Sequence, residues 1–241
     1  MKLELDTIYN IDCLEGMRTL PDKSVDCIIT DPPYEFKKTI GGGTFGTHFG
    51  KSTYKKGRTY HAELTPMSEG IKNDILEEML RVCKKPNIYL FCNKDQVHQY
   101  LNFAISHGCN FDILTWHKTD CTPMCGNKYL SDTEYIIFIR KGATVYGTYD
   151  TKHKYFLQKS NTDEKDIWHH PTIKPLNIIK TLVINSSQEG EVVLDPFMGS
   201  GTTAVACQQL GRHFIGYELN EKYHKTACQR VAADKAQTRL F

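Results

Sequence analysis

An acid followed by two prolines and an aromatic residue is the pattern in this sequence with the clearest chemical meaning. Asp31-Pro32-Pro33-Tyr34 directly follows the apolar run at residues 25–30, which predicts a buried strand. The prolines stop the strand and stiffen the backbone, and they remove two N–H donors while their carbonyls remain as acceptors. A carboxylate and a carbonyl can each accept one hydrogen of a planar amino group, and Tyr34 can stack on its ring. The tetrapeptide predicts a site for an aromatic amine, with a plain strand-ending turn as the alternative.

A glycine turn between a strand and a helix is the second chemical pattern. The apolar segment 192–195 ends in Asp195, and Gly199-Ser200-Gly201 precedes a helix that is expected to begin at Thr202. Glycines let the backbone approach a ligand closely, and the free N–H groups of a helix N-terminus favour a carboxylate or a phosphate. Ala204 stands where a dinucleotide fingerprint has its third glycine, so the full fingerprint is absent.

A second acid follows at the end of the next predicted strand. The segment 214–218 ends in Glu218, 17 residues after Gly201. An acid about 20 residues past a glycine turn is where a ribose diol is held. Two acids at neighbouring strand ends suit a nucleoside-type cofactor without a phosphate, and S-adenosylmethionine fits that description. The alternative is that Glu218 only caps a helix beginning near Asn220.

Alternating strands and helices must position these residues. We expect strands at residues 25–30, 87–92, 111–117, 134–140, 192–195 and 214–218, and helices at residues 71–83, 96–107, 176–187 and 202–210. This alternation predicts an α/β fold in which a sheet that is parallel at its centre has helices on both faces. Residues 35–66 and 141–168 have no sustained periodicity, and the first of these segments is interpreted as a long, mobile loop.

The composition is that of an ordinary globular protein. A length of 241 residues predicts a single domain over residues 1–241, and 40% hydrophobic residues suffice for a core. No apolar run reaches the ~20 residues that span a bilayer, and the N-terminal acids are unlike a signal peptide. Nine scattered cysteines, several within apolar runs, predict buried reduced thiols. We therefore expect a cytoplasmic protein without a membrane partner.

Together these motifs resemble a known enzyme family. Asp31-Pro32-Pro33-Tyr34 and the segment 195–201 resemble the motifs of the DNA methyltransferases that modify amino groups. The tetrapeptide precedes the glycine loop, an order that resembles the circularly permuted β group. The segments 170–175 and 11–17 resemble two further family motifs, and the resemblance spans about residues 8–140 and 168–232. It implies a Rossmann-like, S-adenosylmethionine-dependent methyltransferase fold with permuted motif order and mostly parallel strands.

The resemblance also implies roles for individual residues. Asp31 and the Pro32 carbonyl would hold the target amine, with Pro33 and Tyr34 completing the catalytic tetrapeptide, and Glu218 would bind the ribose hydroxyls of S-adenosylmethionine. Asp12 would contact the adenine amine of the cofactor, and Thr172 and Lys174 would face its methionine carboxylate. The remaining cofactor contacts would come from Cys13, Asp195, Phe197, Gly199, Ser200, Gly201 and Thr202.

Double-stranded DNA is the expected partner, with the target base flipped out of the helix. The loop 35–66 carries six basic residues against two acids, interleaved with aromatic side chains that can stack on bases. The segment 141–168 is a short candidate for target recognition. A homodimer and a cognate restriction endonuclease remain open as further partners. The basic residues expected to contact DNA are Lys37, Lys38, Lys51, Lys55, Lys56 and Arg58.

Several alternatives compete with methylation of adenine at N6. Methyltransferases acting on N4 of cytosine more often carry Ser in place of Asp31, so this residue favours adenine. Protein-glutamine and RNA methyltransferases usually carry Asn there and lack the permuted order. A DNA-binding protein on a degenerate methyltransferase fold would have no need of an intact Asp31 and Glu218. No metal site is expected, because Cys121, Cys125 and His117 lack a convincing second pair of ligands.

Overall fold

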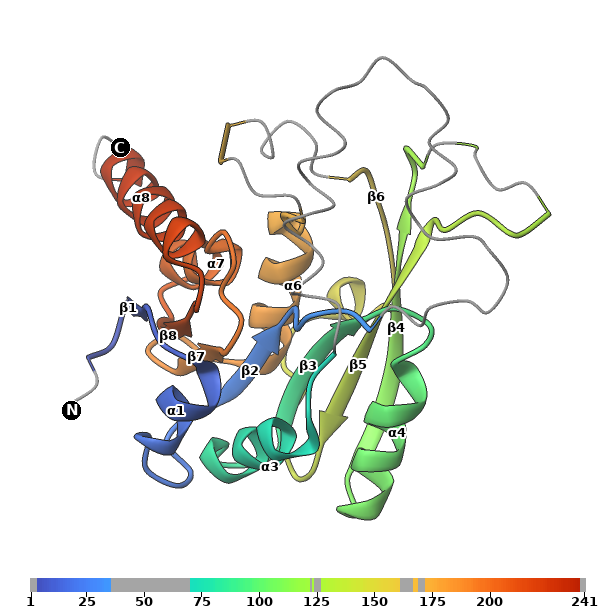
Figure 1. The fold of residues 1–241 in the computed structure, drawn as a ribbon, viewed down its shortest axis with the longest axis horizontal. Helices are drawn as coiled ribbons and strands as arrows, with labels where there is room; N and C mark the ends of the chain where they lie inside the picture. Colours follow the sequence, from blue (N-terminus) through green and yellow to red (C-terminus); the bar gives the residue numbers. More distant parts are fainter. Residues whose placement is uncertain are drawn as a thin grey trace.

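Strands from both ends of the chain share one sheet (Figure 1). The computed structural model describes residues 4–35, 70–121, 123, 127–160, 167–168 and 172–238. These residues form an eight-stranded sheet in the order β1-β8-β7-β2-β3-β5-β4-β6. The strands are β1 (Thr7–Tyr9), β2 (Cys27–Thr30), β3 (Asn87–Cys92), β4 (Asn110–Lys118), β5 (Thr133–Arg140), β6 (Tyr155–Gln158), β7 (Val192–Asp195) and β8 (His213–Tyr217).

The sheet is parallel at its centre, as the sequence predicts. Strands β1, β8, β7, β2 and β3 pair in parallel, and β6 is parallel to β4. Within the described part of the chain, β5 alone runs antiparallel to its neighbours. The chain continues from β2 to β3 on one side and from β7 to β8 on the other, so the strand order reverses between β2 and β7. Ligands of open α/β sheets bind beside the carboxyl ends of the strands at such a reversal.

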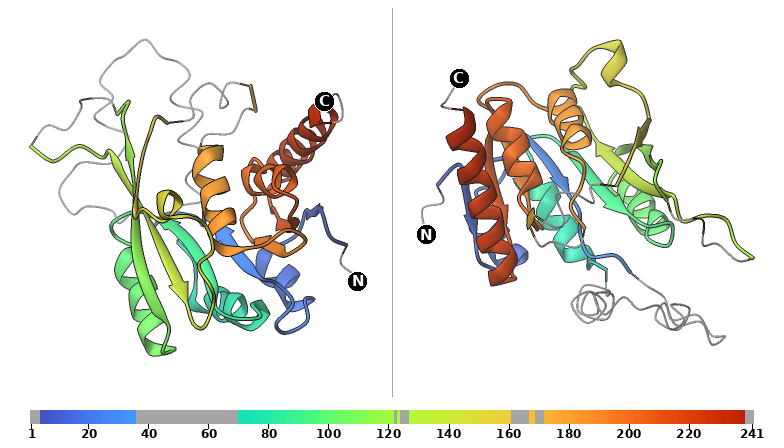
Figure 2. Two further views of the ribbon diagram at one scale, coloured as in Figure 1. Left: turned by 180° about the vertical axis from the view of Figure 1, so that it is seen from behind. Right: turned by 90° about the horizontal axis from the view of Figure 1, so that it is seen from above.

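Helices cover both faces of the sheet (Figure 2). One face carries α1 (Cys13–Arg18), α3 (Asn73–Val82) and α4 (Val97–Ser106), and the other carries α6 (Leu176–Ser186), α7 (Thr202–Gln209) and α8 (Glu221–Thr238). Side chains alternate along β2, so that Ile28 joins the first core while Cys27 and Ile29 join the second. The central strands are therefore buried on both sides, which explains their continuous apolar runs.

The structure contains elements that the periodicity of the sequence does not indicate. Strand β1 and helix α1 are too short for a clear pattern, and α8 has a largely polar surface. The segment 141–168 contains the 3₁₀ helix η2 (Tyr149–Thr151) and edge strand β6, whose apolar run is only three residues long. Of the expected loop 35–66, the structure describes Glu35, and its six basic residues lie outside the described residues. None of the described helices is long and apolar enough to cross a membrane.

Candidate active site

A cavity of about 660 Å³ lies at the carboxyl ends of β2 and β7. The parallel register pairs Ile28 with Leu194, so the segments that follow the two strands enter the same space. The Asp31-Pro32-Pro33-Tyr34 turn lines the cavity from β2, and the segment from Asp195 to Ser200 lines it from β7. Pairing of β2 with β7 thus brings together two motifs that are far apart in the sequence.

Asp31 has one occupied and one open carboxylate oxygen. Its Oδ2 accepts a hydrogen bond from Lys174 Nζ at 2.5 Å, whereas the buried Oδ1 has no hydrogen-bond partner within the described structure. Burial raises the pKa of Asp31 above its ordinary value and the nearby Glu134 adds to this effect, while the Lys174 ammonium opposes it. The open oxygen is an acceptor that can take a hydrogen from a group bound in the cavity.

Two lysines and a tyrosine surround a second acid, Glu134, beside Asp31. Tyr34 donates its hydroxyl hydrogen to Glu134 Oε2 at 2.9 Å, and Lys174 Nζ lies 3.4 Å from the same oxygen. Lys118 Nζ lies 2.6 Å from Glu134 Oε1. Burial acts to raise the pKa of Glu134, but the ammonium groups of Lys174 and Lys118 outweigh it and lower the pKa to about 2. Glu134 is therefore an anion throughout the neutral range.

The connection between β3 and α4 fixes the backbone of the proline turn. Gln96, which is fully buried, donates from Nε2 to the Pro33 carbonyl at 3.0 Å. Asn93 donates from Nδ2 to the Glu35 carbonyl at 2.8 Å. The Pro33 carbonyl is thus already engaged by the protein, which leaves the Pro32 carbonyl as the backbone acceptor that the sequence analysis assigns to an amine.

Asp195 holds the two halves of the site together by hydrogen bonds. Its Oδ1 accepts from the Thr30 hydroxyl at 2.7 Å and from the Phe197 N–H at 3.1 Å, and its Oδ2 accepts from the Thr203 hydroxyl at 2.7 Å. Burial raises the pKa of Asp195 to about 6, against the opposing effect of these donors. The carboxylate therefore links the end of β2 to the loop that precedes α7.

Glu218 contacts the glycine loop directly. Its Oε2 accepts from the Gly199 N–H at 2.8 Å, and its Oε1 accepts from the Asn220 N–H at 2.8 Å. Burial raises the pKa of Glu218 above its ordinary value. Gly199 and Gly201 both have positive φ angles, 53° and 82°, which allow the tight turn. Glu218 thus lies at the cavity and also begins the turn into α8, so the two sequence interpretations are compatible.

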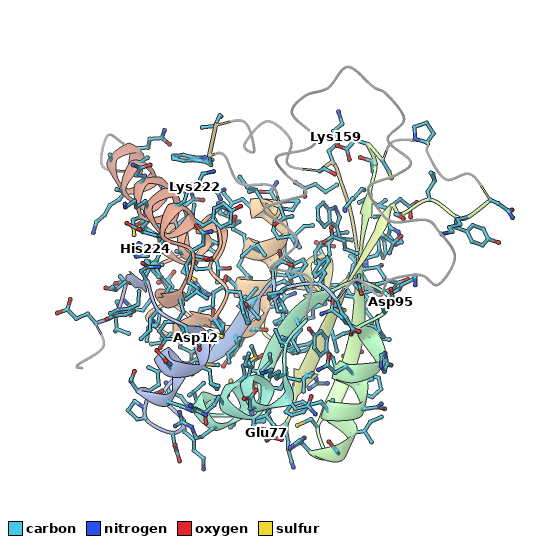
Figure 3. The ribbon with its side chains drawn as sticks, in the orientation of Figure 1. Asp12, Glu77, Asp95, Lys159, Lys222 and His224 are labelled. Atoms are coloured by element: carbon cyan, nitrogen blue, oxygen red, sulfur yellow. The ribbon has the colours of Figure 1, made fainter. Side chains whose placement is uncertain are left out.

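The cavity is also lined by Asp12, which lies at the start of α1 (Figure 3). Asp12 caps this helix, because its Oδ1 accepts from the Leu14 N–H at 2.9 Å and the Glu15 N–H at 3.2 Å. Leu219, which is 70% exposed, lies along the rim of the cavity after β8. Two acids, Asp12 and Glu218, line this part of the cavity together with apolar side chains.

The cavity gathers most of the residues that the sequence analysis selects. Gly201 is the exception among the described ones: it caps α7 and lies against Ala227, where an added Cβ would come within 3.1 Å of that methyl group. The assigned roles remain predictions. The selected residues that line the cavity are Asp12, Cys13, Asp31, Pro32, Pro33, Tyr34, Thr172, Lys174, Asp195, Phe197, Gly199, Ser200, Thr202 and Glu218.

Sequence reasoning missed Glu134, Lys118 and Gln96. Glu134 is the second residue of the antiparallel strand β5 and Lys118 is the last residue of β4, so both lie at the end of the sheet where Asp31 follows β2. The sequence does show a charged residue beside a long apolar run. It does not show the direction of the strand, which decides at which end of the sheet that residue lies. Lys174 was expected to face the cofactor carboxylate, and in the structure it contacts Asp31 and Glu134.

The residues considered for a metal site are engaged in other contacts where the structure describes them. His117 lies within hydrogen-bond distance of the hydroxyls of Thr115 and Thr133, each at 3.0 Å. Cys125 lies outside the described residues. Among the residues with described positions, no three His, Cys, Asp or Glu side chains are grouped to hold a metal ion.

Sequence comparisons relate the chain to DNA methylases. The model of the N6/N4 DNA methylase family matches residues 25–229. The type II methyltransferase M2.DpnII of Streptococcus pneumoniae is 28% identical over 253 residues, covering 94% of this chain and 90% of that protein. The protein YubD of Escherichia coli is 31% identical over 232 residues, covering 92% of this chain and 88% of its own length.

Solved structures share the fold. An M1.HpyAVI–SAM complex matches with a TM-score of 0.65 at 24% identity, covering 93% of this chain and 98% of that chain. The PvuII DNA methyltransferase, which is cytosine-N4-specific, matches with a TM-score of 0.68 at 12% identity, covering 96% and 91%. These likenesses confirm the α/β methyltransferase fold that the sequence predicts.

Proposed function

The chain belongs to the N6/N4 family of DNA methylases, and we propose that this DNA methyltransferase acts on N6 of adenine. The observation that carries the proposal is the open Oδ1 of Asp31, a buried acceptor beside the Tyr34 ring. A base that enters the cavity can give one amine hydrogen to this oxygen and the other to the Pro32 carbonyl. A base within a duplex cannot reach such a pocket and must first be flipped out.

The same cavity has the donors and acceptors that S-adenosylmethionine needs. Glu218 and Asp12 offer carboxylates for hydroxyl and amine hydrogens, and Phe197 offers an apolar wall. The carboxyl group of a methionine moiety can lie at the N-terminal turn of α7, where backbone N–H groups carry a partial positive charge. When bound, S-adenosylmethionine supplies a methyl group on a positively charged sulfur.

The residues of the proline turn prepare the amine for transfer. The lone pair of an aromatic amine is delocalised into the ring, which makes the nitrogen a poor nucleophile. Acceptors on both hydrogens draw the nitrogen toward a tetrahedral geometry and localise the lone pair. Burial raises the pKa of Asp31, which makes its carboxylate a better acceptor for the proton that the nitrogen must lose. Positioning can contribute ~7–11 kcal/mol, and no covalent enzyme intermediate is needed.

Methylation of cytosine at N4 is the second candidate, favoured by the structural likeness to the PvuII enzyme. Asp31 supports adenine, since cytosine enzymes more often carry Ser at this position. Incubating DNA with the protein and S-adenosylmethionine, then digesting it to nucleosides for mass spectrometry, separates the two products. N6-methyladenine supports the proposal, and N4-methylcytosine alone overturns it. A degenerate binding protein would yield neither and would bind no S-adenosylmethionine in calorimetry.

We further propose that the segment 35–66 contacts phosphates through its basic residues. Replacing Lys51, Lys55, Lys56 and Arg58 with Ala should weaken DNA binding similarly across sequences and flatten its salt dependence. The methylated sequence should stay unchanged, because phosphate contacts carry no base information. A changed methylated sequence would show that this segment reads bases.

The relatives suggest the setting in which the enzyme acts. Several are type II methyltransferases, such as M2.MboI of Moraxella bovis, which is 29% identical over 248 residues. We propose that this chain works in the cytoplasm beside an endonuclease that cuts the same DNA sequence unless it is methylated. A homodimer would double the protein surface available for DNA contacts, and light scattering with and without DNA tests for one.

A further inference from the structure

Glu134 has no part in the chemistry described so far, yet it contacts three groups of the cavity. Its Oε2 accepts the Tyr34 hydroxyl hydrogen at 2.9 Å and lies 3.4 Å from Lys174 Nζ, and its Oε1 lies 2.6 Å from Lys118 Nζ. The side chain is 15% exposed, and that of Lys174 is 8% exposed. Glu134 thus lies in the wall of the cavity, next to Tyr34 and separated from Asp31 by the Lys174 ammonium.

Stability alone does not account for these buried charges. Removing a carboxylate and an ammonium group such as those of Glu134 and Lys174 from water costs several kcal/mol per ion, and their attraction recovers this only with good geometry. Apolar residues of similar volume would often serve the fold as well or better. The charges of Glu134, Lys118 and Lys174 are therefore expected to serve the site that they line.

The first effect of Glu134 is on the Tyr34 ring. Pro33 fixes the backbone end of this residue, because its carbonyl accepts from the buried Gln96 side chain. Glu134 fixes the far end through the hydroxyl, and Lys174 Nζ lies 5.4 Å from the ring centroid. The ring cannot rotate away from the cavity without breaking the hydrogen bond to Glu134.

The second effect is on Asp31, through Lys174. The Lys174 ammonium lies between the two acids, at 2.5 Å from Asp31 Oδ2 and 3.4 Å from Glu134 Oε2. Attraction from Glu134 holds the ammonium on the side of Oδ2, and Oδ1 is left as the open acceptor. One acid thus influences both groups that a bound base would touch.

We propose that Glu134 is a positioning residue for methyl transfer, which holds the Tyr34 ring and, through Lys174, the Asp31 carboxylate in the arrangement that a flipped base requires. The inference rests on the proposed function. It assigns Glu134 no contact with the base or the cofactor. Its loss should therefore lower kcat while leaving S-adenosylmethionine binding intact.

Two substitutions separate the effects of Glu134. Glu134→Gln keeps an acceptor for the Tyr34 hydroxyl but removes the charge that holds Lys174, whereas Glu134→Ala removes both. We expect kcat to fall about tenfold or more in the alanine variant and less in the glutamine variant, with KM for S-adenosylmethionine changed by less than about twofold. With 2-aminopurine as the target base, fluorescence of the alanine complex should exceed that of wild type, because the base stacks less well on Tyr34.

A double-mutant cycle tests the link to Tyr34. Tyr34→Phe deletes only the hydroxyl, so its effect on kcat should largely disappear in the Glu134→Ala background. If the alanine variant does not fold, the cycle is run with Glu134→Gln, and a partial loss of the Tyr34→Phe effect is then expected. Effects that multiply independently, or a kcat of Glu134→Ala within about twofold of wild type, would overturn the positioning role.

Glu77→Gln is the matched control, since this acid on α3 also contacts a basic side chain, with Oε1 at 3.0 Å from His107 Nε2, but lies outside the cavity. It should methylate DNA at the wild-type rate. If wild type and this control methylate no DNA, the proposed function itself fails. If both are active and Glu134→Ala is equally active, only the positioning role fails.

Discussion

The carboxylates on the two sides of the cavity contact different kinds of groups. On the side that we propose binds the cofactor (the cofactor side), Asp195 and Glu218 accept hydrogen bonds from hydroxyl and backbone N–H donors. On the side that we propose binds the base (the base side), Asp31 and Glu134 are neutralised by ammonium groups from other parts of the chain. Backbone and hydroxyl donors fix a loop's shape, whereas ion pairs set the charge of a pocket. The base side is therefore expected to control the reaction, and the cofactor side to control binding.

The largest effect is expected from Asp31. Asp31→Ala should lower methyl transfer by roughly 10²–10³-fold or more, because the amine loses its carboxylate acceptor. Binding of S-adenosylmethionine, measured by calorimetry, should change little, since its proposed contacts lie on the other side of the cavity. Near-normal turnover in a radiolabelled methyl assay would remove Asp31 from the mechanism, and lost cofactor binding would break the division between the two sides.

Glu218 should show the opposite pattern. Glu218→Ala should weaken S-adenosylmethionine binding by roughly 1.5–3 kcal/mol, the range for a charge-assisted hydrogen bond, with a smaller effect on kcat at saturating cofactor. Titration calorimetry measures the loss. Glu221→Ala is the control, because Glu221 lies on the exposed surface of α8 and pairs with Lys225. An unchanged dissociation constant in Glu218→Ala would leave this residue only its role in the turn before α8.

The raised pKa of Asp195 can be tested through the pH dependence of the free energy of unfolding. Its pKa in the folded protein is about 6, above the ordinary value of 3.8, so the folded state binds this proton more tightly than the unfolded chain does. Its contribution to the free energy of unfolding therefore rises as pH falls from 7 to 5, by on the order of 1 kcal/mol. Asp195→Asn should remove that part of the rise.

Urea unfolding of wild type and Asp195→Asn at pH 7 and pH 5 measures this difference. Asp31 also has a raised pKa, so wild type and variant share its contribution, and the difference between them isolates Asp195. Glu134 acts in the opposite direction, because its pKa is lowered to about 2, but its stabilisation is lost only below about 4.5. Identical pH dependence in both proteins would contradict the raised pKa of Asp195.

The smallest effect is expected from Gln96, which acts on the proline turn through a neutral hydrogen bond. Gln96→Ala removes the donor to the Pro33 carbonyl, and kcat should fall by roughly 2- to 10-fold, the equivalent of 0.5–1.5 kcal/mol. Steady-state kinetics with saturating S-adenosylmethionine provide the measurement. A loss as large as that of Asp31→Ala would mean that the turn has collapsed.

The contrast between the two sides also explains what the sequence could predict. The cofactor side is built from contiguous segments, 195–203 and 218–220, whose strand, turn and acid can be read in order. Strands β3 and β7 were predicted with their observed bounds, because they are uninterrupted apolar runs between polar or proline residues. Local patterns thus sufficed for the sheet centre and the glycine loop.

The base side required tertiary structure. Asp31, Lys118, Glu134 and Lys174 meet only because β5 runs antiparallel and β4 lies beyond it, an order that no local pattern encodes. The sequence predicted the proline turn but not the ion cluster behind it. Edge strand β6 was missed for a different reason, since its apolar run of three residues, 155–157, is too short to indicate a strand within a polar segment.

During translation, β2 is synthesised long before β7, the strand that pairs with it. Asp195 follows its hydrogen-bond partner Thr30 by 165 residues. At synthesis rates of about 5–20 residues per second, the nascent chain spends roughly 10–30 s with one edge of β2 unpaired. During that interval the Asp31-Pro32-Pro33-Tyr34 turn has no glycine loop beside it. The cavity is therefore complete only after β7 has left the ribosome and has inserted beside β2.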